Sequence, residues 1–444
     1  MPEGRLLLTL SVPIMFSMLV QALYNIVDSL FVARLSEDAL TAVSLAFPIL
    51  NVFHAISIGT ASGINALLSK RLGEKNQRAV NFAAGNGILL GLFTGVIAFV
   101  TALTCTRFFY ETQLGQSAIT ELGVDYTTIL LLFAVFPAGA ITFERLLIST
   151  GKSFYSMIAQ AGGSLVNMIF DPIMIFGMCG CPAMGIKGAA IATVLGQALQ
   201  MCIAIYFNCT KNKEITFSPE CFKPHLPTVK SIYTVGIPVT IMCSIGSFMV
   251  YGFNKILLAY SSTAAAVLGV YFKLQSFIFM PIFGLNQGMI PIIAYNYGAK
   301  KPSRMMRTLK LAVCGAVSVM FCGFLFFEFK APLLLKIFDA SDNMLAIGTV
   351  ALRRIGWHFP LAGACVVIGG FFQAMGDAWM SMVNSITRQL GFLLPAAFVL
   401  SVLFGLDAVW WAFAIAEVAS LSLTLYFLKM ICARRIYELK KEIQ

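Results

Sequence analysis

Apolar residues form long runs along this chain, and short polar or charged stretches interrupt them. A run of about 20 apolar residues has the length that a helix needs to cross a bilayer. Cutting the sequence at glycine, proline and charge clusters gives about twelve such spans, about six in each half. The expected spans are residues 8–33, 42–68, 80–105, 124–149, 156–178, 188–208, 232–260, 264–294, 305–328, 345–374, 379–404 and 408–431. This predicts an all-α polytopic membrane protein.

The spacing of proline, glycine and aromatic residues shows that the chain contains one pattern twice. The pattern that begins at Pro13 returns 225 residues later (238 − 13 = 225). The matching pairs are Pro13 and Pro238, Ala39 and Ala264, Phe47 and Phe272, Gly59 and Gly284, Gly63 and Gly288, and Gly73 and Gly298. We therefore expect two homologous six-helix lobes. The predicted parts are an N-terminal lobe at 1–208, a cytoplasmic linker at 209–230, a C-terminal lobe at 231–433 and a cytoplasmic tail at 434–444.

The duplication favours a transporter. Because each half holds an even number of spans, the two repeats run parallel and are related by a pseudo-twofold axis along the membrane normal, a layout described for secondary transporters. Gly59 and Gly63, with their counterparts Gly284 and Gly288, have a spacing that lets helix backbones approach closely, either in static packing or at a moving interface. Pro13 removes a backbone hydrogen bond early in the first span and permits a bend there.

Composition and charge agree with a membrane protein. Hydrophobic residues make up 59% of the chain and charged residues 11%, and the mean hydropathy is +0.84, whereas a soluble domain has about a quarter charged residues. The net charge of +11 would also suit a nucleic-acid partner, but the basic clusters all fall on one side of the predicted membrane. We therefore expect no nucleic-acid partner, a multi-pass protein of the plasma membrane, and both termini in the cytoplasm.

Two aspartates inside the predicted spans are the first candidates for function, because charge is costly in hydrocarbon. Asp28 lies in the first span and shares a helical face with Gln21 and Tyr24, while Asp171 lies in the fifth span and shares a face with Asn167. Both spans run outward, so the two carboxylates are expected at similar depth in the outer half of the membrane.

Three interpretations fit this acidic pair. Two carboxylates close together and out of water favour binding of a proton. Their oxygens, together with Asn167 and Thr193, are also suited to Na⁺. Each aspartate is equally consistent with a structural hydrogen-bond acceptor. The repeat favours an ion site, because it places Phe253 at the position of Asp28 and apolar leucines at that of Asp171, so that the pair belongs to one half only.

Other polar residues inside the spans have weaker interpretations. Lys273 and Glu417 form either a structural pair or part of a contact to a cationic substrate. Glu144 and Arg145 are expected as an interfacial pair at the cytoplasmic end of the fourth span. The three histidines are isolated and the eleven cysteines form no CxxC motif, so we expect no enzyme activity, no cofactor and no metal other than Na⁺ at the aspartates.

Several stretches of the sequence resemble the multidrug and toxic compound extrusion (MATE) transporters. They are LYNIVDSLFV at Leu23–Val32, NMIFDP at Asn167–Pro172, GAAIAT at Gly188–Thr193, PIFGLNQG at Pro281–Gly288, QAMG at Gln373–Gly376 and the pair Arg388 and Gln389. The resemblance covers nearly the whole chain. It implies twelve helices in two lobes that form a V, and export of organic cations or drugs against inward H⁺ or Na⁺.

The resemblance also implies which residues act. It places the cation site at Asp28, Asn167, Asp171 and Thr193, with Tyr24 nearby and a bend at Pro13. We predict a substrate pathway along Gln21, Asn25, Lys273 and Glu417. The expected partners are small organic or cationic molecules and membrane lipid, and the protein is expected to be a monomer. The alternative function is a flippase for lipid-linked precursors, which a strongly cationic cavity would favour.

Overall fold

The part of the protein that the structure describes consists mainly of helices. The computed structural model describes residues 1–115, 117–338, 341–437 and 439, and these residues form no β-strand. Ten helices are long and apolar enough to cross a membrane, and two bent helix pairs bring the number up to twelve. The predicted all-α membrane fold with about twelve spans is therefore confirmed.

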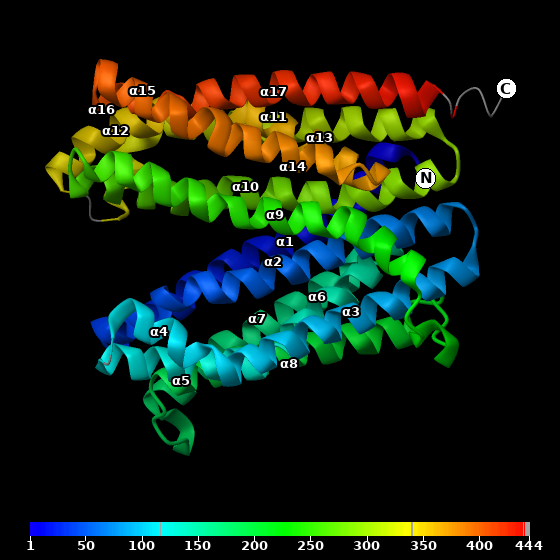
Figure 1. Ribbon diagram of the computed structural model, residues 1–444, viewed down its shortest axis with the longest axis horizontal. Helices are drawn as coiled ribbons and strands as arrows, with labels where there is room; N and C mark the ends of the chain where they lie inside the picture. The colour runs from blue at the N-terminus through cyan, green and yellow to red at the C-terminus, as the bar shows by residue number, and fades with distance from the viewer. Residues whose placement is uncertain (116, 339–340, 438, 440–444) are drawn as a thin grey trace. The chain divides into compact units, whose positions relative to one another are not determined.

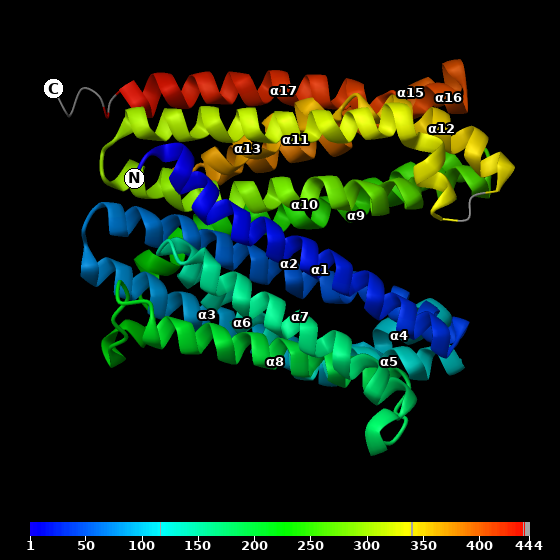
Figure 2. The same cartoon turned by 180° about the vertical axis from the view of Figure 1, so that it is seen from behind.

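The helices follow one another with short connections (Figures 1 and 2). The first half of the chain contains α1 (Glu3–Leu35), α2 (Glu37–Gly73), α3 (Gln77–Thr104), α4 (Thr106–Leu114), α5 (Ala118–Leu132), α6 (Val135–Ser149), α7 (Ser153–Phe176), η1 (Met178–Gly180) and α8 (Ile186–Thr210). After η2 (Pro219–Phe222), the second half contains α9 (Leu226–Leu258), α10 (Ser262–Gly298), α11 (Pro302–Lys336), α12 (Asp342–Gly356), α13 (Phe359–Met375), α14 (Ala378–Ile386), the π-helix η3 (Thr387–Leu393), α15 (Leu394–Phe404), α16 (Leu406–Val409), α17 (Ala412–Ile431) and the π-helix η4 (Cys432–Ile436).

The sequence repeat extends to the caps of the helices. Ser36 begins α2, and its hydroxyl accepts a hydrogen bond from the backbone N–H of Ala39 at 3.0 Å. Ser261 begins α10 in the same way, with a bond of 3.1 Å from Ala264. Each bond satisfies one backbone donor that a helix start leaves unpaired. The two halves therefore begin their second helix at equivalent residues.

Two of the predicted spans are bent. The expected span 124–149 is divided into α5 and α6, whose axes differ by 44°, and the expected span 345–374 is divided into α12 and α13, whose axes differ by 49°. Pro137 and Pro360 lie in the first turn of α6 and of α13 respectively. A proline lacks an N–H and clashes with the preceding helical turn, so it permits a new helix to start but disfavours continuation of the previous one.

The helices form two compact units whose boundaries differ from those of the predicted lobes at 1–208 and 231–433. The N-unit consists of Phe16–Thr240, and the C-unit consists of Met1–Met15 together with the chain from Ile241 onward. The first turns of α1 thus pack with the second half of the chain, and the first turns of α9 pack with the first half. The predicted lobes follow the repeat along the sequence, whereas the units follow the packing in space.

Glycines in α2 and α10 explain this exchange. A Cβ atom added to Gly59 would lie 2.5 Å from the backbone oxygen of Gly236 in α9, and one added to Gly284 would lie 2.6 Å from the Cα atom of Met15 in α1. Both distances are below 3.0 Å, which real Cβ contacts do not reach. The glycine pattern therefore brings backbones into direct contact, and in each unit the partner is the start of the other half's first helix.

The two exchanged helices change units close to a proline. α1 passes from the C-unit to the N-unit after Met15, two residues beyond Pro13, and α9 does the reverse after Thr240, two residues beyond Pro238. Both helices continue through their proline without a break.

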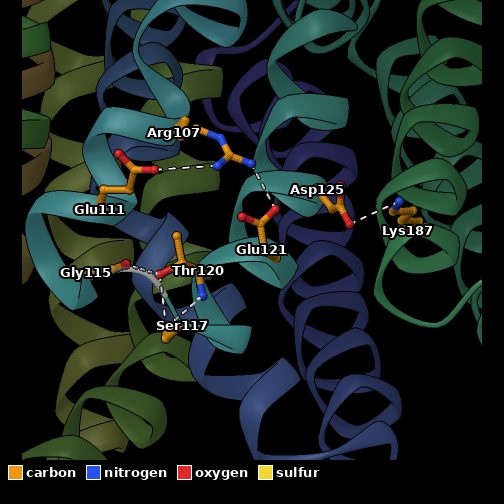
Figure 3. Close-up of polar contacts among 8 residues, drawn as sticks. All are labelled: Arg107, Glu111, Gly115, Ser117, Thr120, Glu121, Asp125 and Lys187. Atoms are coloured by element: carbon orange, nitrogen blue, oxygen red, sulfur yellow. Dashed lines mark hydrogen bonds and ion pairs between the residues drawn. The ribbon is translucent and has the colours of Figure 1, made fainter.

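Ion pairs connect the short helices at the end of the N-unit where α1 ends (Figure 3). Arg107 in α4 lies 3.0 Å from Glu121 in α5 and 3.6 Å from Glu111, and Lys187 in α8 lies 3.1 Å from Asp125 in α5. These side chains are exposed, and exposed pairs contribute about 0.2–1 kcal/mol each. They align α4, α5 and α8 without adding much stability.

Candidate functional site

The candidate site lies beside the most extensive helix packing in the described chain, between α7 and α8 of the N-unit. Gly163 in α7 and Gly196 in α8 meet at this contact, and a Cβ atom on either one would lie 2.7 Å from the backbone oxygen of the other. Small residues at a crossing let two helices approach closely in a membrane. The polar side chains that follow on the same faces are therefore held in fixed positions.

Asn167, Asp171 and Thr193 form a buried polar cluster at this contact. Their relative exposures are 3%, 0% and 7%. With its amide nitrogen directed at Asp171, Asn167 donates to Oδ2 of Asp171 at 3.1 Å, and its oxygen accepts from the hydroxyl of Thr193 at 3.2 Å. Buried polar groups require such partners. The structure thus brings together three of the residues predicted for the cation site, one of them from a different helix.

Asp28 joins this cluster from α1. Its carboxyl group lies within hydrogen-bonding range of the carboxyl group of Asp171. Its Oδ1 atom is buried and has no hydrogen-bond partner among the described residues. Two carboxyl groups at this range require a proton or a cation between them, because two bare carboxylates repel each other. The unpartnered oxygen leaves a position for such an ion.

Tyr126 is a member of the cluster that the sequence did not indicate. It lies in α5, is 6% exposed, and is within electrostatic range of Asp28, Asp171 and Tyr24. A tyrosine in a long apolar span gives no signal of its own, because its partners come from other helices.

A polar cavity of about 60 Å³ extends from this cluster between α1, α7 and α8. Asn167 and Thr193 line one part of it, and the remaining polar lining is glutamine, tyrosine and serine from the three helices: Gln21, Tyr24, Gln160, Ser164, Gln197 and Gln200. Gln160 donates from Nε2 to Oε1 of Gln21 at 2.7 Å. Gln21 and Tyr24, which were predicted as site residues, therefore line the same cavity. The glutamines of α7 and α8 also line it, although they were not predicted.

The other predicted residues lie elsewhere. Asn25 is exposed and does not line the cavity. Glu417 and Lys273 belong to the C-unit and have different partners. Glu417 is 3% exposed and pairs with Arg388 at 3.3 Å, whereas Nζ of Lys273 lies 5.9 Å from the ring centroid of Phe338. The structure therefore gives Glu417 a different ionic partner from the one considered in the sequence analysis.

Glu144 also differs from its sequence interpretation. Instead of an interfacial position beside Arg145, its side chain is in the interior of the N-unit and is 8% exposed. Its Oε1 atom accepts a hydrogen bond of 2.9 Å from Nε2 of Gln200 in α8. The packing of α8 against α6 covers a residue that lies near the end of its own helix.

The chain matches known proteins in both of its halves. The family model described as MatE matches residues 13–173 and 238–399, once in each repeat. The multidrug export protein MepA of Staphylococcus haemolyticus (strain JCSC1435) is 27% identical over 418 residues, which are 94% of this chain and 91% of that protein. MepA of Staphylococcus aureus (strain MSSA476) is 25% identical over 418 residues, with the same shares.

Solved structures with the same fold are also found. One describes the outward-facing conformation of a multidrug resistance MATE family transporter of the MOP superfamily, with a TM-score of 0.93, 23% identity, and coverage of 99% of this chain and 97% of that chain. Another is of a MOP superfamily transporter from Pyrococcus furiosus, with a TM-score of 0.92, 22% identity and coverage of 99% and 97%. At these identities the similarity establishes the fold.

Proposed function

Because this chain belongs to the MatE family, we propose that it exports organic cations or drugs by alternating access, in exchange for H⁺ or Na⁺. The main support is the pair of Asp28 and Asp171, two carboxyl groups held within hydrogen-bonding range between membrane-spanning helices. Ionisable groups at such depth are typical of coupling-ion sites in transporters. The multidrug export proteins that align with 94% of the chain support drugs as the substrate class.

The packing of the helices suggests how ion binding moves the protein. Asp171 is on the closely packed pair α7 and α8, whereas Asp28 is on α1, whose first residues, Met1–Met15, belong to the C-unit. A bound H⁺ or Na⁺ removes the repulsion between the carboxylates and favours the approach of α1 to α7. Because the start of α1 is fixed against Gly284 and Gly288, the movement bends α1 near Pro13. This bend shifts the equilibrium between the outward-facing and the inward-facing state, and the substrate is released.

The orientation and assembly belong to the same proposal. Basic residues cluster in the α2–α3, α8–α9 and α10–α11 connections and at Arg434 and Arg435, and by the positive-inside rule these clusters support a cytoplasmic position of both termini. The protein then acts in the plasma membrane as a monomer, with Gln21 and Asn25 on the substrate pathway of the N-unit and Lys273 and Glu417 on that of the C-unit. No cofactor other than the coupling ion takes part.

Efflux from proteoliposomes tests this function. Vesicles that contain wild type or Asp28→Asn are loaded with a fluorescent lipophilic cation, and a pH gradient or a Na⁺ gradient is imposed separately. We expect one gradient to drive efflux by wild type and the variant to lose it. Asp125→Asn is the matched control, because it removes an exposed carboxylate of the same unit and should leave efflux unchanged.

Two results would contradict the proposal. Full ion-driven efflux by Asp28→Asn would exclude the acidic pair as the coupling site. Absence of efflux by wild type under both gradients would exclude drug antiport and make transport of lipid-linked precursors the function to test next.

A further inference from the structure

We propose that the N-unit contains an internal proton pathway, which leads from Asp28 and Asp171 through the glutamine-lined cavity to Glu144 in α6. This inference rests on the proposed ion coupling and assigns Glu144 as a second proton-binding residue. In each transfer an O–H bond of one carboxylic acid breaks and an O–H bond forms on the next carboxylate, with water between them and no change of oxidation state.

Polar side chains form a continuous stripe on the helices that line the pathway. In α8, Thr193, Gln197 and Gln200 are separated by four and three residues, which places them on one helical face. In α7, Gln160, Asn167 and Asp171 lie on one face for the same reason. At 1.5 Å per residue the α7 stripe is about 16 Å long, roughly half of the ~30 Å hydrocarbon core. A stripe of this length is longer than a single ion site needs.

The cavity between these stripes has room for water. Its volume is about 60 Å³, and one water needs about 15 Å³ of such space, so about four molecules fit. Amide and hydroxyl groups on its wall supply the hydrogen bonds that ordered water requires. The bond of 2.7 Å between Gln160 and Gln21 holds two of these side chains in place. The cavity is therefore suited to a short chain of waters that begins at Asn167 and Thr193.

Gln200 connects this cavity to Glu144. Its side chain lines the cavity and also donates to Oε1 of Glu144 at 2.9 Å. Glu144 is 8% exposed, and a buried carboxylate in a membrane protein is costly unless a cation or a proton compensates it. A carboxyl group at the end of a polar cavity is a natural acceptor for a proton that leaves the cation site.

The charges around Glu144 permit both of its protonation states. Helices α2, α3, α7 and α8 pack against α6. In the described part of the chain, the charged group that acts on Glu144 is Arg145, its neighbour in α6, and His54 of α2 lies near Arg145 in turn. Arg145 favours the carboxylate, whereas burial favours the acid.

Further polar side chains lie at the end of α6. Ser149, five residues further along, donates to Oδ1 of Asn65 in α2 at 2.9 Å, and Ser69 donates to the backbone oxygen of Ser149 at 3.1 Å. Asn65 is 0% exposed, and its Nδ2 atom has no partner among the described residues. An unpaired buried amide is a position where ordered water binds. Asn65 lies beside Ser149, the last residue of α6, at the helix end that we place in the cytoplasm.

Infrared difference spectroscopy tests the proton site directly. Purified protein in lipid is titrated with pH, and the carbonyl-stretch absorption of protonated carboxylic acids is recorded for wild type and Glu144→Gln. We expect Glu144→Gln to lose the band of one buried carboxylic acid, whereas the control Glu74→Gln, at an exposed residue paired with Arg71, keeps this band. An unchanged spectrum in Glu144→Gln would overturn the proposal.

A second variant tests the connection without removing a charge. Gln200→Met keeps Glu144 but breaks its link to the cavity, so we expect its infrared band to remain while pH-driven efflux slows by about tenfold or more, as loss of a proton-transfer partner does. Wild-type rates of pH-driven efflux in both Glu144→Gln and Gln200→Met would overturn the pathway. Efflux that only a Na⁺ gradient drives, in a protein whose infrared spectrum shows no band from Glu144, would also overturn it.

These results separate the pathway from the proposed function. A Glu144 band in a protein that exports no drug would leave the proton site standing and exclude drug antiport. Proton-driven efflux that is lost in Asp28→Asn but retained in the Glu144 and Gln200 variants would leave the antiporter standing and exclude the pathway.

Discussion

Replacement of Gly63 by Ala tests the packing that defines the N-unit. A Cβ atom at this position would lie 2.9 Å from the backbone carbonyl carbon of Ile232 in α9 and closer still to its oxygen. Backbone atoms cannot move aside as a side chain can, so α2 and α9 would have to separate. Overpacking of this kind costs about 1–3 kcal/mol. We expect a loss of about 2 kcal/mol, roughly a 30-fold change in the ratio of folded to unfolded protein.

Gly269→Ala is the matched control for this substitution. Gly269 also lies inside a helix, α10, but a Cβ atom there meets nothing within 4 Å. Alanine has the higher helix propensity by up to about 1 kcal/mol, so this variant should be neutral or slightly stabilised. Unfolding of both variants in detergent, followed by circular dichroism, measures the difference. Equal stability of the two variants would refute the close contact between α2 and α9.

Three further predictions concern coupling and the C-unit. Pro13→Ala restores a backbone donor and stiffens α1, so the initial rate of ion-driven efflux should fall about tenfold, or ~1.4 kcal/mol in activation free energy. Pro238→Ala changes the half without the acidic pair and should retain a higher efflux rate. Equal initial rates of the two variants would contradict this. Thr193→Val removes the hydroxyl that bonds Asn167 at 3.2 Å, and the loss of about 1 kcal/mol should weaken affinity for the coupling ion about fivefold by isothermal titration calorimetry. Arg388→Met leaves the Glu417 carboxylate buried without its partner at 3.3 Å and should lower the free energy of unfolding by about 3–5 kcal/mol. Addition of Glu417→Leu should recover most of this loss. A double variant as unstable as Arg388→Met alone would argue against the ion pair of Arg388 and Glu417.

The sequence was sufficient to predict the helical spans and the duplication, because both depend on composition and spacing. The bends between α5 and α6 and between α12 and α13 were not predicted, because hydrophobic periodicity does not report the direction of a helix axis. A signal was present in Pro137 and Pro360, which lie 223 residues apart (360 − 137 = 223) and so recur almost with the repeat.

The exchange of helix starts between the units depends on information that the sequence does not contain. The spacing of Gly59 and Gly63 indicates that another backbone comes close, but it does not identify which one. In the structure it is the start of α9, from the other repeat. Prediction of contiguous lobes was the natural result, because the repeat defines boundaries along the chain and not in space.

The candidate site was partly visible in the sequence. Asp28, Asn167, Asp171 and Thr193 could be proposed together from motif and helical spacing, and the structure places them in one cluster, although their role as an ion site stays a prediction. The sequence interpretation places Glu144 at the interface, because it lies near the end of its helix, where charged residues are usually interfacial. Its burial depends on Gln200 of α8, a tertiary contact that no local pattern reports.

Counterflow of the coupling ion is the defining property of an antiporter and can be measured without an imposed ion gradient. Vesicles that contain the protein are given a substrate gradient without any ion gradient, while entrapped indicators report pH and Na⁺. We expect substrate movement in one direction to drive H⁺ or Na⁺ in the other, and Asp28→Asn to abolish this ion movement. Substrate movement by wild type without counterflow of either ion would contradict it.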